Sequence, residues 1–394
     1  MYDFCVIGAG IVGLATARAL NARFPGAAIA VLDKESTAGA HQTSHNSGVV
    51  HSGLYYKPGS LKARLCVEGQ RELEGFAADA GIPLTRSGKL VIATREDEVA
   101  AMHELFRRGT ENGLRDLRVL DRSEIADFEP HATGVAALHV PEAGVIDFSL
   151  VAAALQQQVT GDVFLGSAVT GIEAAVDAVD VMTDGRRVRA GRIVNCAGLH
   201  ADRVAEMAGA KVPVRIVPFR GEYYRLTAAA DHLVRALIYP VPDPRFPFLG
   251  VHFTRRSDRS IEVGPNAVLA LGREYYRGAK PNWGDVRSVL AYPGFRRLVR
   301  RYWRTGAAEA WRSMRRSTYA RSAQALVPDI RAEHLEPGGA GVRAQAVTPD
   351  GKLVDDFSII ETDRAVHVLN APSPAATASL AIGRSIAERV AASM

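Results

Sequence analysis

The chain has 394 residues, of which 47% are hydrophobic and 23% are charged, and its formal net charge is +5. This length is too great for one ordinary hydrophobic core and predicts about two domains, while the composition excludes a largely disordered chain. The modest positive charge permits anionic substrates, cofactor phosphates or an acidic membrane surface, without selecting among them.

Residues 1–33 predict a β-strand, an α-helix and a second β-strand. An apolar run at residues 4–8 is typical of a buried parallel strand, residues 11–23 have helical periodicity, and the run AIAVLD ends in Asp33. The turn before the helix carries the glycines of a GxGxxG motif, Gly8, Gly10 and Gly13. They permit the turn, a close approach of backbone to a pyrophosphate, and packing of helix on strand, while the acid can accept hydrogen bonds from a ribose. The strand, the helix, the second strand and the terminal acid are all in place. The glycine motif is therefore better explained by dinucleotide binding than by a tight turn without a ligand.

The N-terminal segment does not have the features of a secretion signal. Asp3 stands where an exporting segment carries positive charge, and three glycines interrupt the apolar run. No apolar run approaches the roughly 20 residues that span a bilayer. Cys5, Cys66 and Cys196 are isolated thiols without the spacing of a zinc site or a disulfide framework. We therefore expect a cytoplasmic protein without a metal site, at most peripheral to a membrane.

Residues 192–210, RIVNCAGLHADRVAEMAGA, predict a second place where backbone meets an extended cofactor, because an apolar strand runs into a glycine turn and a helix. Together with the N-terminal motif, this segment is similar to the two FAD-contacting segments of flavoproteins with the glutathione-reductase type of fold. No separate nicotinamide domain is indicated. We therefore expect an α/β fold (α+β overall) with a Rossmann-type FAD-binding domain and an interleaved mixed-sheet substrate domain.

The stretch HQTSHNSGVVHSGLYYKPGSLKARLCVEGQREL, with the blocks PVPDPRFPFLGVHFTR and NAPSPAATASLAIG, resembles the signature of L-2-hydroxyglutarate dehydrogenases and oxidases. These belong to the D-amino-acid-oxidase-like superfamily of FAD enzymes. The resemblance covers essentially the whole chain, in order. Family members commonly have Glu where Asp33 stands, and GREYY at residues 272–276 is a variation inside a familiar block.

The resemblance implies FAD as the cofactor and a set of contacts to it. Small residues after the ribose acid would pass the pyrophosphate and flavin. A Pro/Ser turn near the C-terminus would be followed by a long helix, with Pro372 and Pro374 at its start and its N-terminal dipole directed at the flavin. The implied FAD contacts are Gly8, Gly10, Gly13, Asp33, Lys34, Ser44, Asn46, Ser47, Gly48, Val169, Ala197, Gly198, Pro372, Ser373, Ala375, Ala376 and Thr377.

The expected chemistry needs a base, because oxidising a 2-hydroxy acid removes a hydroxyl proton as hydride leaves the carbon for flavin N5. His51, which would arrive near the flavin ring, and His252, in a strand-like stretch, compete for this role. The sequence favours His51 slightly, although a buried histidine bonded to a carbonyl is the alternative. His41 and His45 are expected to be structural or to lie on the phosphate side.

A dicarboxylate substrate also needs fixed positive charge, for which the planar fork of Arg suits better than Lys. Arg343 is similar in position to the superfamily's Gly-x-Arg element, which holds the substrate α-carboxylate; the alternative is a structural salt bridge. Arg220 could meet the distal carboxylate or brace its strand. Further candidates for polar contacts are Tyr223, Tyr239 and Gln345, whereas Tyr55 and Tyr56 are expected to pack at a cofactor edge.

Two domains follow from these placements. The FAD-binding domain would take residues 1–85, 145–215 and 335–394, and the substrate domain residues 86–144 and 216–334. The predicted function is FAD-dependent oxidation of L-2-hydroxyglutarate to 2-oxoglutarate, with electrons passed to oxygen or a respiratory quinone. The alternatives are oxidation of another small substrate, such as an amino acid or glycerol 3-phosphate, and a non-catalytic flavin-containing binding protein.

Residues 295–321 are strongly basic with interleaved Trp and Tyr. Such a helix can lie on an anionic membrane surface, as a quinone-linked dehydrogenase would require. Nucleic-acid binding is another interpretation of basic residues with aromatics, but no other part of the chain supports it. The third interpretation is that these residues form a helix face exposed to solvent.

Overall fold

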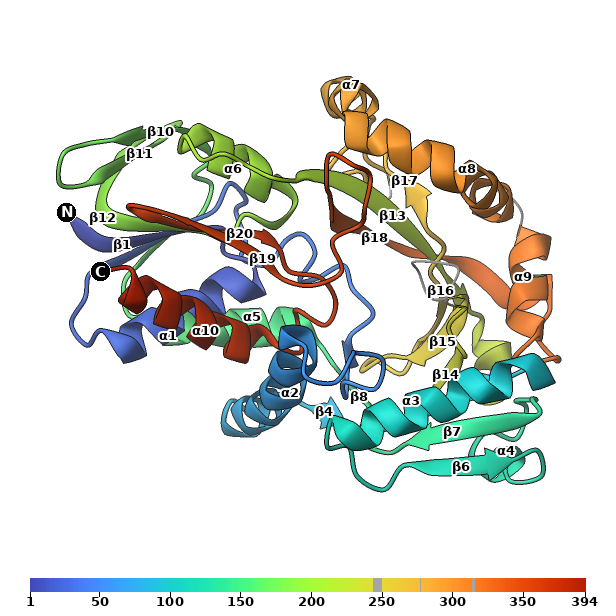
Figure 1. Ribbon diagram of the computed structural model, residues 1–394. Helices are drawn as coiled ribbons and strands as arrows, with labels where there is room; N and C mark the ends of the chain where they lie inside the picture. Colours follow the sequence, from blue (N-terminus) through green and yellow to red (C-terminus); the bar gives the residue numbers. More distant parts are fainter. Residues whose placement is uncertain (244–249, 277, 314–315) are drawn as a thin grey trace.

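The computed structural model describes residues 1–243, 250–276, 278–313 and 316–394, without the side chains of 304–313. Two large β-sheets dominate it, and the chain crosses between them several times (Figure 1). Both termini lie beside the first sheet.

The first sheet has the order β10-β11-β12-β1-β2-β9, and β20 also pairs with β12 and with β19. Its central pairs β12–β1, β1–β2 and β2–β9 are parallel, as expected for short apolar strands buried on both faces. The strands are β1 (Tyr2–Ile7), β2 (Ile29–Leu32), β9 (Asp162–Phe164), β10 (Val169–Ala174), β11 (Val179–Thr183), β12 (Arg187–Asn195), β19 (Ser358–Thr362) and β20 (Ala365–Asn370).

Three helices cover one face of this sheet side by side (Figure 1). They are α1 (Ile11–Arg23), α5 (Phe148–Gln158) and α10 (Ser379–Ala392), and α2 (Leu61–Asp79) packs against α10. The contact of α1 with α10 is close, since a Cβ on Gly383 would lie 2.5 Å from the backbone of Ala15. The C-terminal helix therefore completes a layer that begins at the N-terminus. On the opposite side lies α6 (Ala201–Met207).

The second sheet has the order β17-β13-β16-β15-β14-β5-β7-β6, with β18 paired to β13. Its pairs are antiparallel except β14–β5. The strands are β5 (Lys89–Ala93), β6 (Arg118–Asp121), β7 (Ala136–Val140), β13 (Arg215–Leu226), β14 (Leu237–Pro240), β15 (His252–Arg255), β16 (Ile261–Gly264), β17 (Val268–Leu269) and β18 (Leu335–Val347).

Further elements surround this sheet or link the two (Figure 1). A small sheet joins β3 (Val49–Val50), β8 (Gly144–Ile146) and β4 (Leu84–Thr85). The remaining helices are α3 (Val99–Glu111), α4 (Ile125–Phe128), α7 (Trp283–Ala291), α8 (Pro293–Ser313) and α9 (Arg316–Gln324), with 3-10 turns at Glu96–Glu98, Gly198–His200, Ala228–Leu233 and Ala332–His334. None of the helices in the described residues is long and apolar enough to cross a membrane.

The proposed domain boundaries stay a prediction. Within residues 335–394, which are assigned to the FAD-binding domain, β18 is hydrogen-bonded along β13 in the second sheet, whereas β19 and β20 lie in the first sheet. One expectation about the C-terminal part needs correction. The last helix begins at Ser379 rather than at the prolines, because residues 373–378 form successive turns.

The basic segment 295–321 is not one helix. It spans α8 and α9, and α8 itself is kinked at Tyr302, whose backbone is non-helical. Phe295 and Leu298 are buried against Val217 and Val347 of the second sheet. The apolar face at the start of α8 is therefore used by the core.

Candidate functional site

A cavity of about 1070 Å³ is lined by turns of the first sheet and by strands of the second. The glycine turn borders it, and so do the segments after β2, β12 and β20. Strands β13, β14, β15 and β18 contribute the other wall. A volume of this size, with such an extended lining, suits a large elongated ligand.

The glycine turn has the shape that a dinucleotide requires. Gly8 has φ +106°, and a Cβ there would lie 2.5 Å from the carbonyl oxygen of Cys196. A Cβ on Gly13 would lie 1.9 Å from Gly8 O, so the protein itself excludes side chains at both positions. A Cβ on Gly10 would lie 3.6 Å from its nearest neighbour, Thr43 Oγ1. The space beside Gly10 is therefore open to a ligand. The turn therefore fits a pyrophosphate passing over Gly10.

Polar groups hold this turn in place. Thr43 Oγ1 accepts a hydrogen bond from Ile11 N at 3.0 Å, at the first turn of α1. Asp33 accepts from Ala9 N at 2.6 Å and from Glu35 N at 2.9 Å, which brings its carboxylate to the cavity wall. The partial positive charge of the helix N-terminus faces the same space.

Most of the expected FAD contacts line the cavity: Gly8, Gly10, Asp33, Lys34, Asn46, Ser47, Val169, Ala197, Gly198, Pro372, Ser373, Ala375, Ala376 and Thr377. Gly13, Ser44 and Gly48 are not among its lining residues. Gly13 serves helix packing, Ser44 Oγ donates to Gly39 O, and Gly48 has φ +71° in a tight approach to Ile146 O. These three residues would therefore influence a cofactor only by shaping the backbone around it.

His51 lies where the N-terminal and C-terminal segments meet. Its N–H donates to Thr377 Oγ1 at 3.1 Å, and Thr377 donates in turn to Val49 O at 3.3 Å. Its ring atom Nδ1 is buried without a hydrogen-bond partner among the described residues. Burial, and then the charges of Lys89 and His252, lower the pKa of His51 to about 3.

His252 begins β15 on the opposite wall. Its Nδ1 lies 2.8 Å from Gly250 O, which places the proton on Nδ1 and leaves Nε2 as an acceptor. Its ring lies 4.1 Å from the ring of Tyr239, and burial lowers its pKa to about 3. Both histidines are therefore neutral at physiological pH, as a general base must be.

Four of the five predicted substrate contacts lie at the cavity. Arg343, Tyr223, Tyr239 and Gln345 line the cavity, and Arg343 shares a side-chain hydrogen bond with Tyr223. Gln345 Nε2 donates to the carbonyl oxygens of Ala346 and Val354, so its amide is already partly engaged.

Arg220 does not line the cavity. It pairs with Glu222 at 3.1 Å, lies over the ring of Tyr275 at 4.9 Å, and borders a smaller pocket on the other side of β13. The structure therefore does not bring Arg220 to the histidines.

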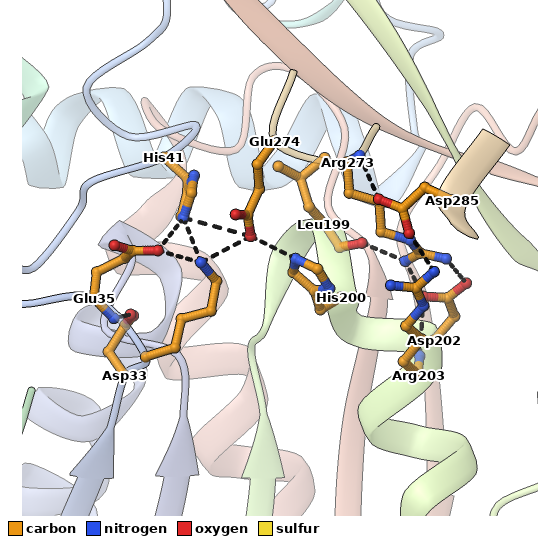
Figure 2. Close-up of polar contacts among 11 residues, drawn as sticks. Asp33, Glu35, His41, Leu199, His200, Asp202, Arg203, Arg273, Glu274 and Asp285 are labelled. Carbon is orange, nitrogen blue, oxygen red and sulfur yellow. Dashed lines mark hydrogen bonds and ion pairs between the residues drawn. The ribbon is translucent and has the colours of Figure 1, made fainter. Parts of the chain in front are cut away.

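A second polar cluster lies at the edge of the cavity near Asp33 (Figure 2). Glu274, from the loop between β17 and α7, contacts Lys34 at 2.8 Å and His200 at 2.7 Å. Lys34 also pairs with Glu35, and His41 lies 2.9 Å from Glu35. We call these five side chains the Glu274 clasp. It joins a loop of the second sheet to segments that follow β2 and β12.

The loop that carries Glu274 is firmly anchored (Figure 2). Arg273 is only 2% exposed and binds Asp202 and the carbonyl oxygen of Leu199. Its backbone N–H donates to Asp285 at 2.9 Å. Beyond Glu274, the ring of Tyr276 lies 4.3 Å from that of His45. The variation GREYY thus lies in a loop that contacts Lys34, His200 and His45, which line the cavity.

Ligand atoms of Glu35, His41 and Glu274 lie within 4.8 Å of one another, which is a spacing that a metal could use. Lys34 Nζ contacts all three side chains, so an ammonium already supplies positive charge at their centre. We interpret the cluster as an ion-pair network.

Three residues in or beside the site were not identified from the sequence. Glu274 and His200 act through tertiary contacts between distant segments, and no local pattern identifies such partners. Lys89 had a readable signal, since a lysine that opens the apolar run KLVIA is unusual for a buried strand.

Comparison with known proteins agrees with this geometry. A model of the family described as "FAD dependent oxidoreductase" matches residues 3–389. The chain is 47% identical to L-2-hydroxyglutarate dehydrogenase of Indibacter alkaliphilus over 391 residues, 98% of each protein. It is 43% identical to L-2-hydroxyglutarate dehydrogenase of Escherichia coli strain K12, covering 99% of this chain and 93% of that protein. Among solved structures, L-alpha-glycerophosphate oxidase from Mycoplasma pneumoniae with FAD bound has a TM-score of 0.80 at 23% identity, covering 99% of this chain and 94% of that one, which shows a shared fold.

Proposed function

Because the chain belongs to the FAD-dependent oxidoreductase family, we propose that it oxidises L-2-hydroxyglutarate to 2-oxoglutarate. Support for the substrate comes from relatives of that name, which are similar over nearly the full length. The observation that carries the proposal is the cavity, where two neutral histidines and Arg343 face the same space as the glycine turn.

The residues have distinct parts in the proposed reaction. Bound FAD supplies the two-electron acceptor. His51 or His252 takes the hydroxyl proton of the substrate, since each offers a neutral imidazole in the cavity. Arg343, oriented by its hydrogen bond to Tyr223, holds the α-carboxylate. The buried surroundings exclude water and strengthen these interactions.

We also propose a cytoplasmic enzyme that passes electrons to oxygen or to a membrane quinone. The support for membrane contact is a set of exposed side chains on α7 and α8, where Leu290 is 52% exposed and Trp303 is 58% exposed. Arg300 and Arg301 of α8 are also exposed. Exposed aromatic, aliphatic and arginine side chains suit an anionic membrane surface.

Two other functions compete with this one. An amino acid or glycerol 3-phosphate could enter the same fold, and a flavin-containing binding protein would need no base. The neutral tautomer of His252, fixed by Gly250, favours turnover over binding alone.

Anaerobic mixing of the purified yellow protein with L-2-hydroxyglutarate tests the proposal, followed by flavin absorbance. Selective bleaching by this compound, with the D enantiomer and L-glutamate as controls, is the expected result. Bleaching by L-glutamate or glycerol 3-phosphate instead would assign another substrate. No bleaching by any of them would support a binding protein.

A further inference from the structure

Lys89 is a charged side chain in an apolar setting. It is only 2% exposed, and its neighbours in β5 are Leu90, Val91 and Ile92. Among the described residues, its ammonium contacts the rings of Tyr55 and Tyr239 and has no hydrogen-bond or ion-pair partner. Burying an ammonium without such a partner is unfavourable, so a partner from outside the chain is expected.

The strand register places Lys89 next to residues that line the cavity. Lys89 pairs with Leu237 across β5 and β14, so it shares a face of the sheet with Leu237 and with Tyr239, two residues further on. Its Nζ lies 5.1 Å from the ring centre of Tyr239 and 4.6 Å from that of Tyr55. Both tyrosines line the cavity. The ammonium is thus held directly behind the cavity wall by two cation–π contacts.

Tyr55 offers a hydrogen-bond donor at the same place. Its hydroxyl is buried and has no partner among the described residues. Burial raises its pKa well above the ordinary value, so the proton stays on the oxygen. A donor and a positive charge that both lack partners suit a carboxylate.

Apart from Arg343, the other cations near the cavity that the structure describes are paired with carboxylates. Lys62 pairs with Asp355 at 3.1 Å, Arg256 with Glu262 at 3.0 Å, and Arg203 with Asp285. Arg220, which was expected to meet a distal carboxylate, pairs with Glu222 outside the cavity. Lys89 is therefore better placed than these to attract an additional anion.

We propose that Lys89, with Tyr55, is the specificity determinant that selects substrates carrying a second carboxylate. This inference rests on the proposed oxidation of L-2-hydroxyglutarate, and it names the group that would distinguish that dicarboxylate from a monocarboxylic hydroxy acid. The charge acts on the distal carboxylate, while Arg343 holds the α-carboxylate.

The groups that face Lys89 titrate far from neutrality or are paired. Burial raises the pKa of Cys66 to about 12, and raises those of Tyr55 and Tyr239. His51 and His252 have pKa values near 3. Burial lowers the pKa of Lys89 itself to about 8. Lys62, on α2, is held by Asp355. Loss of dicarboxylate affinity as pH rises through about 8 would therefore report Lys89.

The test compares two ligands that differ in one carboxylate, glutarate and pentanoate, by calorimetric titration of the FAD-loaded protein. Lys89→Met should weaken glutarate binding roughly 10- to 100-fold and leave pentanoate binding unchanged. Lys89→Arg should retain the preference for glutarate and extend it to higher pH. Lys57→Met, at an exposed lysine two residues after Tyr55, is the matched control and should behave like the parent protein.

Folding of the variants is checked in the same samples by FAD content and thermal melting. Lys89→Met removes an unpaired buried charge, so its melting temperature should equal or exceed that of the parent. If Lys89→Met fails to fold, Lys89→Arg and Tyr55→Phe still test the preference, since Tyr55→Phe should weaken glutarate more than pentanoate.

Two failures are distinguishable. If the parent protein neither bleaches with L-2-hydroxyglutarate nor prefers glutarate, the proposed function is wrong. If the parent does both and Lys89→Met keeps the same preference, the role of Lys89 is wrong. The role of Lys89 would also be wrong if Lys89→Met changed the reduction potential of the flavin but not the preference for glutarate. The charge of Lys89 would then act on the cofactor rather than on the substrate.

Discussion

At the residue scale, the two histidines illustrate how burial sets chemistry. A histidine in water is half protonated near pH 6.5. His51 and His252 stay neutral far below that, because the cavity wall removes them from water. Each can therefore accept a proton without first losing one.

Substitution of each histidine tests which one is the base. Of the variants His51→Asn and His252→Asn, the one that lacks the base should reduce its flavin roughly 100- to 10,000-fold more slowly under anaerobic conditions. The other variant should show a smaller loss of rate. His103→Asn, on the exposed side of α3, is the control. Retention of the full rate in both variants would exclude a histidine base.

The pH profile of the parent provides a further measurement. Because both folded pKa values lie near 3, below the unfolded value near 6.5, kcat/KM should show no inflection at pH 6–7. The same shift means that stability falls as pH drops from about 6.5 toward 3, since the unfolded chain then binds more protons.

At the element scale, the loop between β17 and α7 is held by ion pairs to residues beside the cavity. Arg273 anchors it to Asp202, and Glu274 reaches Lys34 and His200. The hydrogen bond from His200 holds the pKa of Glu274 down to about 2, against the opposing effect of burial and with help from Lys34. Glu274 is therefore ionised throughout the physiological range.

We expect the Glu274 clasp to retain the cofactor. Glu274→Gln removes the charge that Lys34 and His200 share, so FAD should dissociate roughly three- to tenfold faster, measured by flavin fluorescence on dilution. Glu336→Gln, at an exposed position in β18, is the control. In the parent, retention should hold from pH 5 to 8 and weaken below about 4.5, since a carboxyl with a depressed pKa loses its contribution as pH falls toward that pKa. Equal dissociation from both variants would remove the clasp from this role.

At the scale of the whole molecule, exposed residues of α7 and α8 are the candidates for the proposed membrane contact. Arg296 and Arg297 donate to backbone carbonyls of Leu290, Ala291 and Pro349, so they brace the fold. Arg300 and Arg301 are the more suitable targets for substitution.

Replacing both Arg300 and Arg301 by Gln should reduce sedimentation with anionic vesicles several-fold, because roughly 1 kcal/mol of attraction is lost for each charge. Replacing Arg71 and Arg122, exposed elsewhere, removes the same charge and should have little effect. An equal loss of sedimentation in both double variants would indicate that only the total charge matters. If the parent protein does not bind the vesicles, the membrane proposal is wrong.

Several features of the fold were predictable because their signals are local. The glycine spacing, the apolar strand before it and Asp33 after it specify the βαβ unit, since each requirement is steric or hydrogen-bonding and acts within one turn. The segment around Gly198 was identified for the same reason. His51 and His252 were named as candidates from the sequence, and their roles stay predictions.

Tertiary structure alone decided which charges are paired. Arg220 and Arg343 lie on neighbouring strands and look alike in the sequence, yet β13 turns one away from the cavity while β18 presents the other to it. Lys89 meets Tyr55 and Tyr239 only because β5 pairs with β14. The sequence by itself determined the cofactor class and the chemistry at hand, because those depend on short-range geometry. The tertiary structure decided where unpaired charge remains, because pairing depends on contacts between residues far apart in the chain.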